Sequence, residues 1–270
     1  MTDSTDPAET FSLSLEAAER YESAFVPAFF AQWAPTICAA AGVGPGQRVL
    51  DVACGTGIVA RTAARLVAPT GSVVGLDVNE AMLTVARRVS PNLEFRQGDA
   101  TALPFPDESF DTVMCQLALM FFPDPATAVS AMARVIRPDG SVAILVPSAL
   151  GSQPAFKPFV DMAARHAGPE ALSLLSAYFV FGNLDQLVRL VQSSGLRPTV
   201  AETRRGTYRA ASVDAFVTTE VESTPLLERI SDAVYQQIRA EARDVLAPFV
   251  SADQRFEAPF DCNLVVARRP

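Results

Sequence analysis

The sequence predicts an α/β protein with a doubly wound, mostly parallel, seven-stranded sheet, N-terminal helices and helical cap insertions. Between residues 48 and 147, short apolar runs bounded by turn residues alternate with stretches of helical period. This alternation favours parallel strands joined by helices on both faces of one sheet. The first apolar run leads into a glycine-rich turn and then a helix, which is where sheets of this kind bind ligands.

The expected elements follow this alternation along the chain. We expect strands over residues 48–53, 72–78, 93–97, 111–117, 141–147, 198–208 and 263–268. We expect helices over residues 57–67, 80–89, 126–136, 156–166, 183–194 and 212–248. The first helical stretch, residues 14–41, contains Pro27 and Pro35, which should break it into short helices that end at Gly42.

The length of 270 residues suits a single domain that consists of a core and a cap. Its expected parts are N-terminal helices (9–44), a ligand-binding core (45–150), helical cap insertions (151–181 and 212–250) and the end of the core sheet (182–211 and 258–270).

Composition argues against several classes of protein. Hydrophobic residues make up 49% of the chain and charged residues 19%, which is enough to bury a sizeable core. No apolar run reaches the roughly 18 to 20 residues of a membrane-spanning helix. The first ten residues, MTDSTDPAET, lack the pattern of a secretory signal, so we expect a cytoplasmic protein. The net charge of −8 disfavours a nucleic-acid partner, and four scattered cysteines with one histidine disfavour a metal site.

A glycine-rich turn, DVACGTG at residues 51–57, joins the first strand to the first helix of the core. Gly55 and Gly57 allow the backbone to turn sharply and approach a ligand, and the helix that follows presents free N–H groups. The spacing to Ala60 also satisfies the dinucleotide fingerprint G-x-G-x-x-G/A. The turn alone therefore leaves the ligand open.

Three acidic residues at successive strand ends narrow the choice of ligand. Asp51 precedes the glycines, where a pyrophosphate has no use for a carboxylate but a ligand with an ammonium group does. Asp77 ends the second strand, where a carboxylate can hold both hydroxyls of a ribose, and Asp99 follows the third strand, where it can accept the amino group of adenine. Their convergence on one glycine turn favours a nucleoside ligand that carries an amine.

Several segments resemble, in order and spacing, the class I methyltransferases, in particular the branch similar to ubiquinone/menaquinone C-methyltransferases. They are VLDVACGTG, VVGLDVNEAML, GDATALPFPDESFDTV and RVIRPDGSVAI. The resemblance covers residues 14–147 and continues more weakly to residue 266. It implies a Rossmann-like fold, S-adenosyl-L-methionine (SAM) as cofactor, and methyl transfer to a small molecule.

The resemblance also implies which residues bind SAM. They are Tyr21, Asp51, Ala53, Gly55, Gly57, Asp77, Val78, Met82, Asp99, Ala100 and Gln116. The residues that follow the first strand would cradle the methionine moiety, and those that follow the second and third strands would hold the ribose and the adenine. Gln116 would line the methyl end of SAM, and Tyr21 would close over it.

The sequence assigns no catalytic residue. Many relatives carry a histidine after the fourth strand, but this chain has Met120 and Phe121 there. Methyl transfer from a sulfonium is an in-line displacement that depends mainly on positioning, and a base is needed only for an acceptor that holds its proton tightly. The only imidazole is His166 in the cap, so we expect it to lie outside the reaction, which leaves a carboxylate with a raised pKa as the alternative base.

The acceptor pocket is expected to be apolar. Its candidate walls are Phe25, Phe29, Trp33, Met120, Phe121, Phe156, Phe159, Tyr178, Phe179 and Phe181. Such a pocket suits a small, largely apolar or planar acceptor that offers a phenol or enol oxygen, a carboxylate, a thiol or an activated carbon. Cys115 and Gln116 stand where a magnesium-dependent catechol site needs acids, so no metal is expected.

Two other functions compete with methyl transfer. A protein that binds SAM without turnover would keep the same glycine turn and acids, and the sequence does not distinguish it from an enzyme. A nicotinamide-dependent reductase of the short-chain type needs a Tyr-x-x-x-Lys pair. Lys157, the only lysine, has Gln153 four residues before it, so that function is disfavoured.

Overall fold

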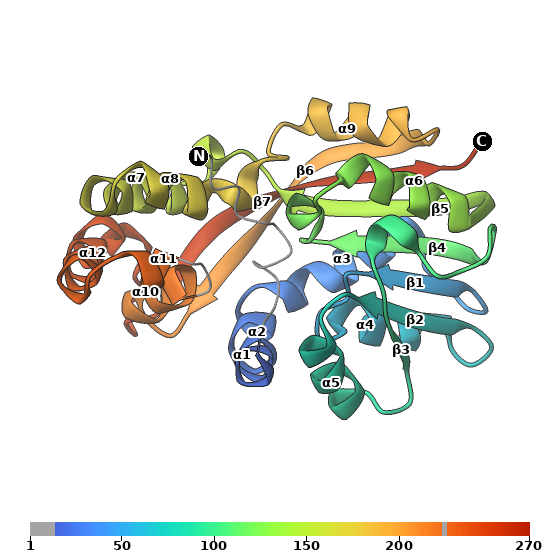
Figure 1. Cartoon of the computed structure of the whole chain (residues 1–270), viewed down its shortest axis with the longest axis horizontal. Helices are drawn as coiled ribbons and strands as arrows, with labels where there is room; N and C mark the ends of the chain where they lie inside the picture. Colours follow the sequence, from blue (N-terminus) through green and yellow to red (C-terminus); the bar gives the residue numbers. More distant parts are fainter. Residues whose placement is uncertain (1–13, 223–225) are drawn as a thin grey trace, which may run out of the picture. The chain divides into compact units, whose positions relative to one another are not determined.

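The computed structural model describes residues 14–222 and 226–270, and the chain divides into two compact units (Figure 1). Unit 1 consists of Met1–Val146, Asn183–Thr203 and Asn263–Pro270, and unit 2 of Pro147–Gly182 and Arg204–Cys262. Residues 9–13 of the expected N-terminal helices and residues 223–225 of the second cap insertion lie outside the described residues. Among the described helices, none is by itself long and apolar enough to cross a membrane, although two bent helix pairs reach that length and composition together.

A seven-stranded sheet runs in the order β3-β2-β1-β4-β5-β7-β6, which confirms the expected architecture. Its strands are β1 (Arg48–Val52), β2 (Ser72–Asp77), β3 (Glu94–Gln97), β4 (Phe110–Gln116), β5 (Ile136–Pro147), β6 (Arg197–Ala210) and β7 (Phe256–Arg268). The pairs β1–β2, β1–β4, β2–β3 and β4–β5 are parallel. The strand order reverses between β1 and β4, and such a switch point leaves a ligand crevice at the carboxyl ends of the strands.

β6 and β7 form an antiparallel hairpin at one end of the strand order. The Thr199 hydroxyl donates to the carbonyl of Val266, and Thr203 bonds to Asn263, so partners on the two strands run in opposite directions. β7 begins at Phe256, well before its expected start at residue 263. Its first half alternates in burial and only its second half is continuously buried, so the apolar run in the sequence indicates the second half alone.

The fifth strand also starts earlier than expected. β5 begins at Ile136, and its register against β4 shifts between the pairs Phe110–Ile136 and Thr112–Ser141. The expected turn at residues 137–140 is an irregular stretch inside this strand. Asp139 has a φ of 63° there, a left-handed conformation that aspartate adopts more readily than most residues.

The N-terminal helices are interrupted at a position other than the expected one. They are α1 (Leu15–Arg20), the π-helical turn η2 (Tyr21–Phe25), α2 (Val26–Ala28), η3 (Phe30–Gln32) and α3 (Trp33–Ala41). The chain leaves the helical region at Phe29, with φ −139° and ψ −52°. The expected breaks at Pro27 and Pro35 are wrong, because each proline lies in the first turn of a helix, where its missing N–H is tolerated. Gly42 ends α3 in the left-handed conformation, as expected.

The remaining helices of unit 1 pack around the strands. They are α4 (Ile58–Val67), α5 (Glu80–Val89), η4 (Ala100–Ala102), η5 (Leu119–Phe121), α6 (Pro125–Val135) and α9 (Leu184–Ser193). α3 packs beside α4, α4 lies against β1 and β2, and α6 packs beside α9. The Asn79 side chain accepts a hydrogen bond from the Met82 N–H and caps α5, which confirms the expected helix start.

Unit 2 is built on helices and an aromatic core. Its helices are η6 (Leu150–Ser152), α7 (Phe156–Ala167), α8 (Pro169–Ser176), η7 (Ala177–Phe179), α10 (Val213–Glu222), α11 (Leu226–Arg229), α12 (Asp232–Val245) and η8 (Ala247–Phe249). The Phe156 ring contacts four other rings, those of Phe179, Tyr208, Phe216 and Phe260. Phe156 and Phe159, two of the expected pocket walls, are therefore core residues of this unit.

Candidate functional site

The candidate site lies where the carboxyl ends of β1, β2 and β4 meet. In the sheet, Asp51 of β1 pairs with Gly75 of β2 and with Met114 of β4. Asp77 and Gln116 end their strands on the same side of this row. The residues expected to bind SAM are thus contributed by neighbouring strand ends at the switch point of the sheet.

The glycine turn needs backbone conformations that few residues adopt. Ala53, Gly55 and Gly57 all have positive φ, at 55°, 54° and 87°. A Cβ on Gly57 would also lie 2.8 Å from the ring of Phe95, so only glycine fits there. Hydrogen bonds from the Cys54 N–H to the Leu76 carbonyl and from the Gly57 N–H to the Cys54 carbonyl close the turn. We call residues 53–57 the glycine loop.

Asp77 holds the glycine loop from β2. One of its carboxylate oxygens accepts from the Gly55 N–H at 2.8 Å, and the other accepts from the Asn79 N–H at 2.9 Å. The side chain is 8% exposed, and this burial raises the pKa of its carboxyl. Each carboxylate oxygen has a second lone pair, so the group can also accept from a ligand hydroxyl.

Asp51 lies beneath the loop and is almost fully buried. Its carboxylate accepts from the Ala60 N–H at 2.9 Å, which satisfies a free N–H in the first turn of α4. The pKa of Asp51 is raised to about 8, mainly by burial and also by the charge of Asp77, while the hydrogen bond from the Ala60 N–H and the Arg61 guanidinium act to lower it. The site therefore holds two acids that a bound cation would favour in their ionised forms.

An apolar surface adjoins the ends of β2 and β3. Val78 directly follows Asp77 and is 58% exposed, which is unusual for a large apolar side chain, whereas Met82 behind it is buried. Asp99 is exposed, and its carboxylate accepts from the Thr101 N–H, with Ala100 buried beside it. An exposed apolar side chain between two strand ends is a suitable platform for the flat face of an adenine.

Tyr21 and Gln116 are brought to the loop from two directions. The Tyr21 ring lies 3.6 Å from the position of a Cβ on Gly55, and its centroid is 4.9 Å from that of Phe30. Burial, and then the charge of Asp77, raise the pKa of the Tyr21 hydroxyl well above its ordinary value. Gln116 is 7% exposed, and its amide nitrogen donates to the Phe30 carbonyl at 3.2 Å.

Some buried polar atoms around the loop have no hydrogen-bond partner within the described part of the chain. They include Glu22 Oε2, Thr56 Oγ1 and Gln116 Oε1. A buried polar atom without a partner costs free energy, and a ligand that supplies the missing bond removes this cost. The amide oxygen of Gln116 is an acceptor only, which suits the ammonium group of a methionine moiety. The residues present therefore fit SAM.

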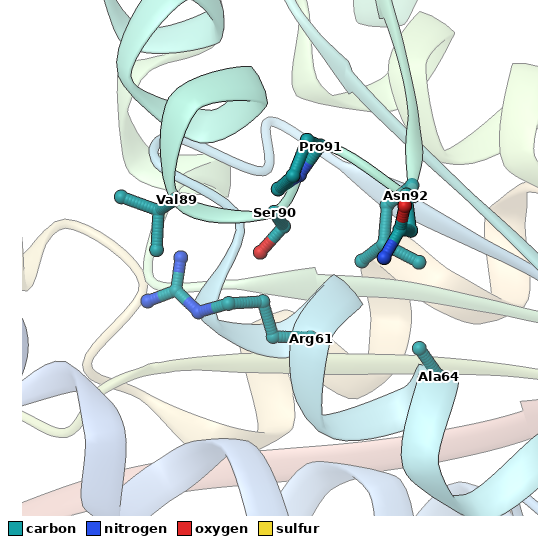
Figure 2. Close-up of a pocket in the computed structure, with 7 residues that line it drawn as sticks. Arg61, Ala64, Val89, Ser90, Pro91 and Asn92 are labelled. Carbon is teal, nitrogen blue, oxygen red and sulfur yellow. The ribbon is translucent and has the colours of Figure 1, made fainter.

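Sequence reasoning missed two residues of this region. Glu22 and Arg61 form an ion pair at 2.9 Å, and Arg61 also donates to the Thr56 carbonyl in the glycine loop. Arg61 lines a shallow pocket together with Ala64 and residues 89–93 (Figure 2). No motif marks this pair, because its members are 39 positions apart and neither belongs to a periodic pattern.

Two candidate bases, His166 and Glu220, lie in unit 2. His166 Nε2 is 2.6 Å from Glu241 Oε2, and the same carboxylate binds Arg165, so the ring is held in a hydrogen-bonding contact between α7 and α12. Glu220 is a carboxyl of the expected alternative kind. It is 6% exposed, hydrogen-bonds to Tyr208, and has its pKa raised by burial to about 7.

Part of this chain matches a known protein family and its members in sequence. A family model described as "Methyltransferase domain" matches residues 50–144. A demethylmenaquinone methyltransferase from Renibacterium salmoninarum is 43% identical over 129 residues, which is 47% of this chain and 51% of the relative. The ubiquinone/menaquinone biosynthesis C-methyltransferase UbiE of Pseudomonas entomophila is 46% identical over 110 residues, 38% of this chain and 43% of the relative. The matches thus span about half of these relatives or less.

Solved structures resemble a larger part of the chain. A crystal structure of a putative methyltransferase from Bacillus halodurans matches with a TM-score of 0.61 at 22% identity, over 88% of this chain and 98% of that one. A phosphoethanolamine N-methyltransferase 2 from Haemonchus contortus matches with a TM-score of 0.60 at 21% identity, over 100% of this chain and 61% of that one. At this identity the likeness shows the fold. The family match identifies residues 50–144 as a methyltransferase domain.

Proposed function

We propose that this protein transfers the methyl group of SAM to a small, largely apolar or planar acceptor, without a metal ion. The observation that carries the proposal is the glycine loop held by Asp77 at the switch point of the sheet. The relatives named above are quinone-biosynthesis methyltransferases, so an activated ring carbon of a quinol-type acceptor is the first candidate. Phenol or enol oxygens, carboxylates and thiols are the other acceptors to test.

The residues that hold SAM in this proposal are the eleven that the resemblance implies. SAM supplies a methyl group activated by the sulfonium charge. Asp77 orients the ribose while it fixes the loop, Val78 supports the adenine, and Gln116 Oε1 accepts from the methionine ammonium. Tyr21 covers the loop and excludes water from it. The burial, charge and missing hydrogen bonds of these groups support the assignment.

Unit 2 is the part of the chain that lies beyond the family match. The family match ends at residue 144, before unit 2 begins at residue 147. The chemistry of the cofactor is therefore shared with relatives through unit 1, while unit 2 consists of sequence that the family model does not cover. The rings of its aromatic core pack against one another, so the acceptor class rests on the relatives, and the net charge of −8 argues for a small acceptor over a nucleic acid.

SAM and its demethylated product should bind at low micromolar concentration, whereas NAD and NADP should not bind. Calorimetry with the full chain measures this directly. A screen of quinols, phenols, thiols and carboxylic acids with methyl-labelled SAM then identifies the acceptor by transfer of label. Binding of NAD without binding of SAM would contradict the proposal, and SAM binding without transfer to any acceptor class would favour a non-catalytic SAM-binding protein.

The substitution Asp77→Ala should weaken SAM binding by about 2 to 4 kcal/mol, because it removes charge-assisted hydrogen bonds both to the ligand and to the Gly55 N–H. Calorimetry on a variant with a native circular dichroism spectrum checks this. Asp185→Ala, which removes an exposed acid from α9, is the matched control and should bind SAM like the wild type. Unchanged affinity in a folded Asp77→Ala protein would exclude Asp77 from the site.

SAM affinity should fall as the pH is lowered from 7.5 to 5.5. The pKa of Asp51 is raised to about 8 in the free protein, so this carboxyl is largely protonated below that pH, and binding of a cation must expel its proton. The loss should approach roughly tenfold for each pH unit. Calorimetry in buffers of different ionisation enthalpy should detect the released proton. Asp51→Asn should flatten the dependence, and a wild-type affinity independent of pH would refute this origin.

The substitution His166→Ala should change turnover by less than about tenfold, because the ring is engaged with Glu241 and a positioned base contributes about a hundredfold or more. The pH–rate profile should keep its shape. Glu241→Gln is the matched control, because it removes the carboxylate that holds the ring and keeps the imidazole, and Glu220→Gln tests the second candidate base of unit 2. A drop beyond a hundredfold in His166→Ala, with SAM affinity intact and Glu241→Gln active, would place the imidazole at the reacting atoms.

A further inference from the structure

Arg61 connects the N-terminal segment, residues 15–28, to the glycine loop. Its Nη2 donates to Glu22 Oε1 at 2.9 Å, and its Nη1 donates to the Thr56 carbonyl at 2.6 Å. Glu22 belongs to the π-helical turn η2, whereas Arg61 lies in the first turns of α4 (Figure 2). One planar guanidinium therefore joins three segments, with each of two donors directed at a different partner.

Burial makes this ion pair stronger than a typical surface pair. The side chains of Arg61 and Glu22 are 16% and 21% exposed, whereas the pair that Arg88 forms with Glu19 of the same N-terminal segment is 58% and 46% exposed. Exposed pairs are screened by water and contribute little, whereas partly buried pairs are screened less. The Glu22–Arg61 ion pair therefore fixes the position of the Arg61 guanidinium, which in turn restrains the loop through the Thr56 carbonyl.

The carbonyl that Arg61 holds belongs to a part of the loop that needs an external restraint. Thr56 lies between Gly55 and Gly57, which both have positive φ. Glycines in such conformations gain freedom when a restraint is lost. Asp77 fixes the loop through the Gly55 N–H, and Arg61 fixes the Thr56–Gly57 peptide through the Thr56 carbonyl. One side chain thus accepts from a backbone N–H of the loop, and the other donates to a backbone carbonyl of the loop.

Glu22 also stands next to the residue that covers the loop. Tyr21 places its ring over Gly55, and the segment before it is packed on α5 through Ala18, Met82 and Val85. When Glu22 pairs with Arg61, the backbone of η2 is held at the loop and Tyr21 is held over Gly55. The same contact therefore restrains the conformation of the loop and the position of Tyr21 above it.

We propose that Glu22 and Arg61 are positioning residues that couple docking of the N-terminal segment to cofactor binding at the glycine loop. Because coupling between sites is reciprocal, a docked segment raises the affinity for SAM, and bound SAM holds the segment in place. The inference rests on the proposed placement of SAM at the loop. In this inference the Glu22–Arg61 ion pair does not contact the cofactor. It keeps the residues that do contact the cofactor in their binding conformation.

The first test is a double-mutant cycle on SAM affinity, measured by calorimetry with the full chain. Glu22→Gln and Arg61→Gln should each weaken SAM roughly tenfold, and the double variant should be no more than about twofold weaker than Arg61→Gln. Arg61→Lys should fall near Arg61→Gln, because an ammonium cannot serve both partners as the guanidinium fork does. Glu19→Gln is the matched control, since it breaks an ion pair of the same segment that does not reach the loop, and it should stay within twofold of the wild type.

The second test needs no cofactor. Hydrogen exchange in the ligand-free protein should be faster at residues 54–57 in Glu22→Gln and Arg61→Gln than in the wild type and Glu19→Gln. Added SAM should slow exchange at residues 15–28 in the wild type and much less in Glu22→Gln. A purely structural ion pair would lower thermal stability without these changes.

Three results would overturn the inference: wild-type affinity in Glu22→Gln, additive effects of the two substitutions on affinity, or unchanged exchange in the glycine loop. A wild-type protein that fails to bind SAM would instead refute the proposed function. If Arg61→Gln does not fold, the comparison of Glu22→Gln with Glu19→Gln decides the matter.

Discussion

The hydrogen bond from the Gly55 N–H to Asp77 fixes the turn on which the rest of the site is arranged. Three residues of that turn adopt left-handed backbone conformations, and such conformations persist only when the surrounding structure imposes them. Asp77 imposes them from β2, and Phe95 of β3 fills the space where a side chain on Gly57 would stand. The parallel sheet thus supplies the restraint, because it brings the ends of β1 and β2 side by side.

The same burial that fixes the loop sets its electrostatics. Asp51 and Asp77 lie close enough for each ionised acid to disfavour ionisation of the other, and desolvation acts in the same direction. Arg61 partly offsets this for Asp51. A cationic ligand relieves both costs at once, so a site that is unfavourable for two carboxylates alone is favourable for carboxylates with a sulfonium cofactor. The two acids therefore favour a positively charged ligand, in addition to the hydrogen bonds that they make.

The interior of unit 2 differs in composition from the cofactor region of unit 1. Its interior is an aromatic cluster around Phe156 and Phe216, in which Glu220 with its partner Tyr208 is a buried polar contact. His166, the only imidazole of the chain, is engaged in a hydrogen bond with Glu241.

Local signals in the sequence determined the order of strands and helices, the glycine turn, the cap of α5 by Asn79 and the acids at three strand ends, because each depends on neighbours within a few residues. Tertiary structure decided what such signals do not carry. It placed the ring of Tyr21 over Gly55, paired Glu22 with Arg61 and began β7 at Phe256. These features arise from contacts between residues far apart in the chain, and such contacts leave no periodic pattern.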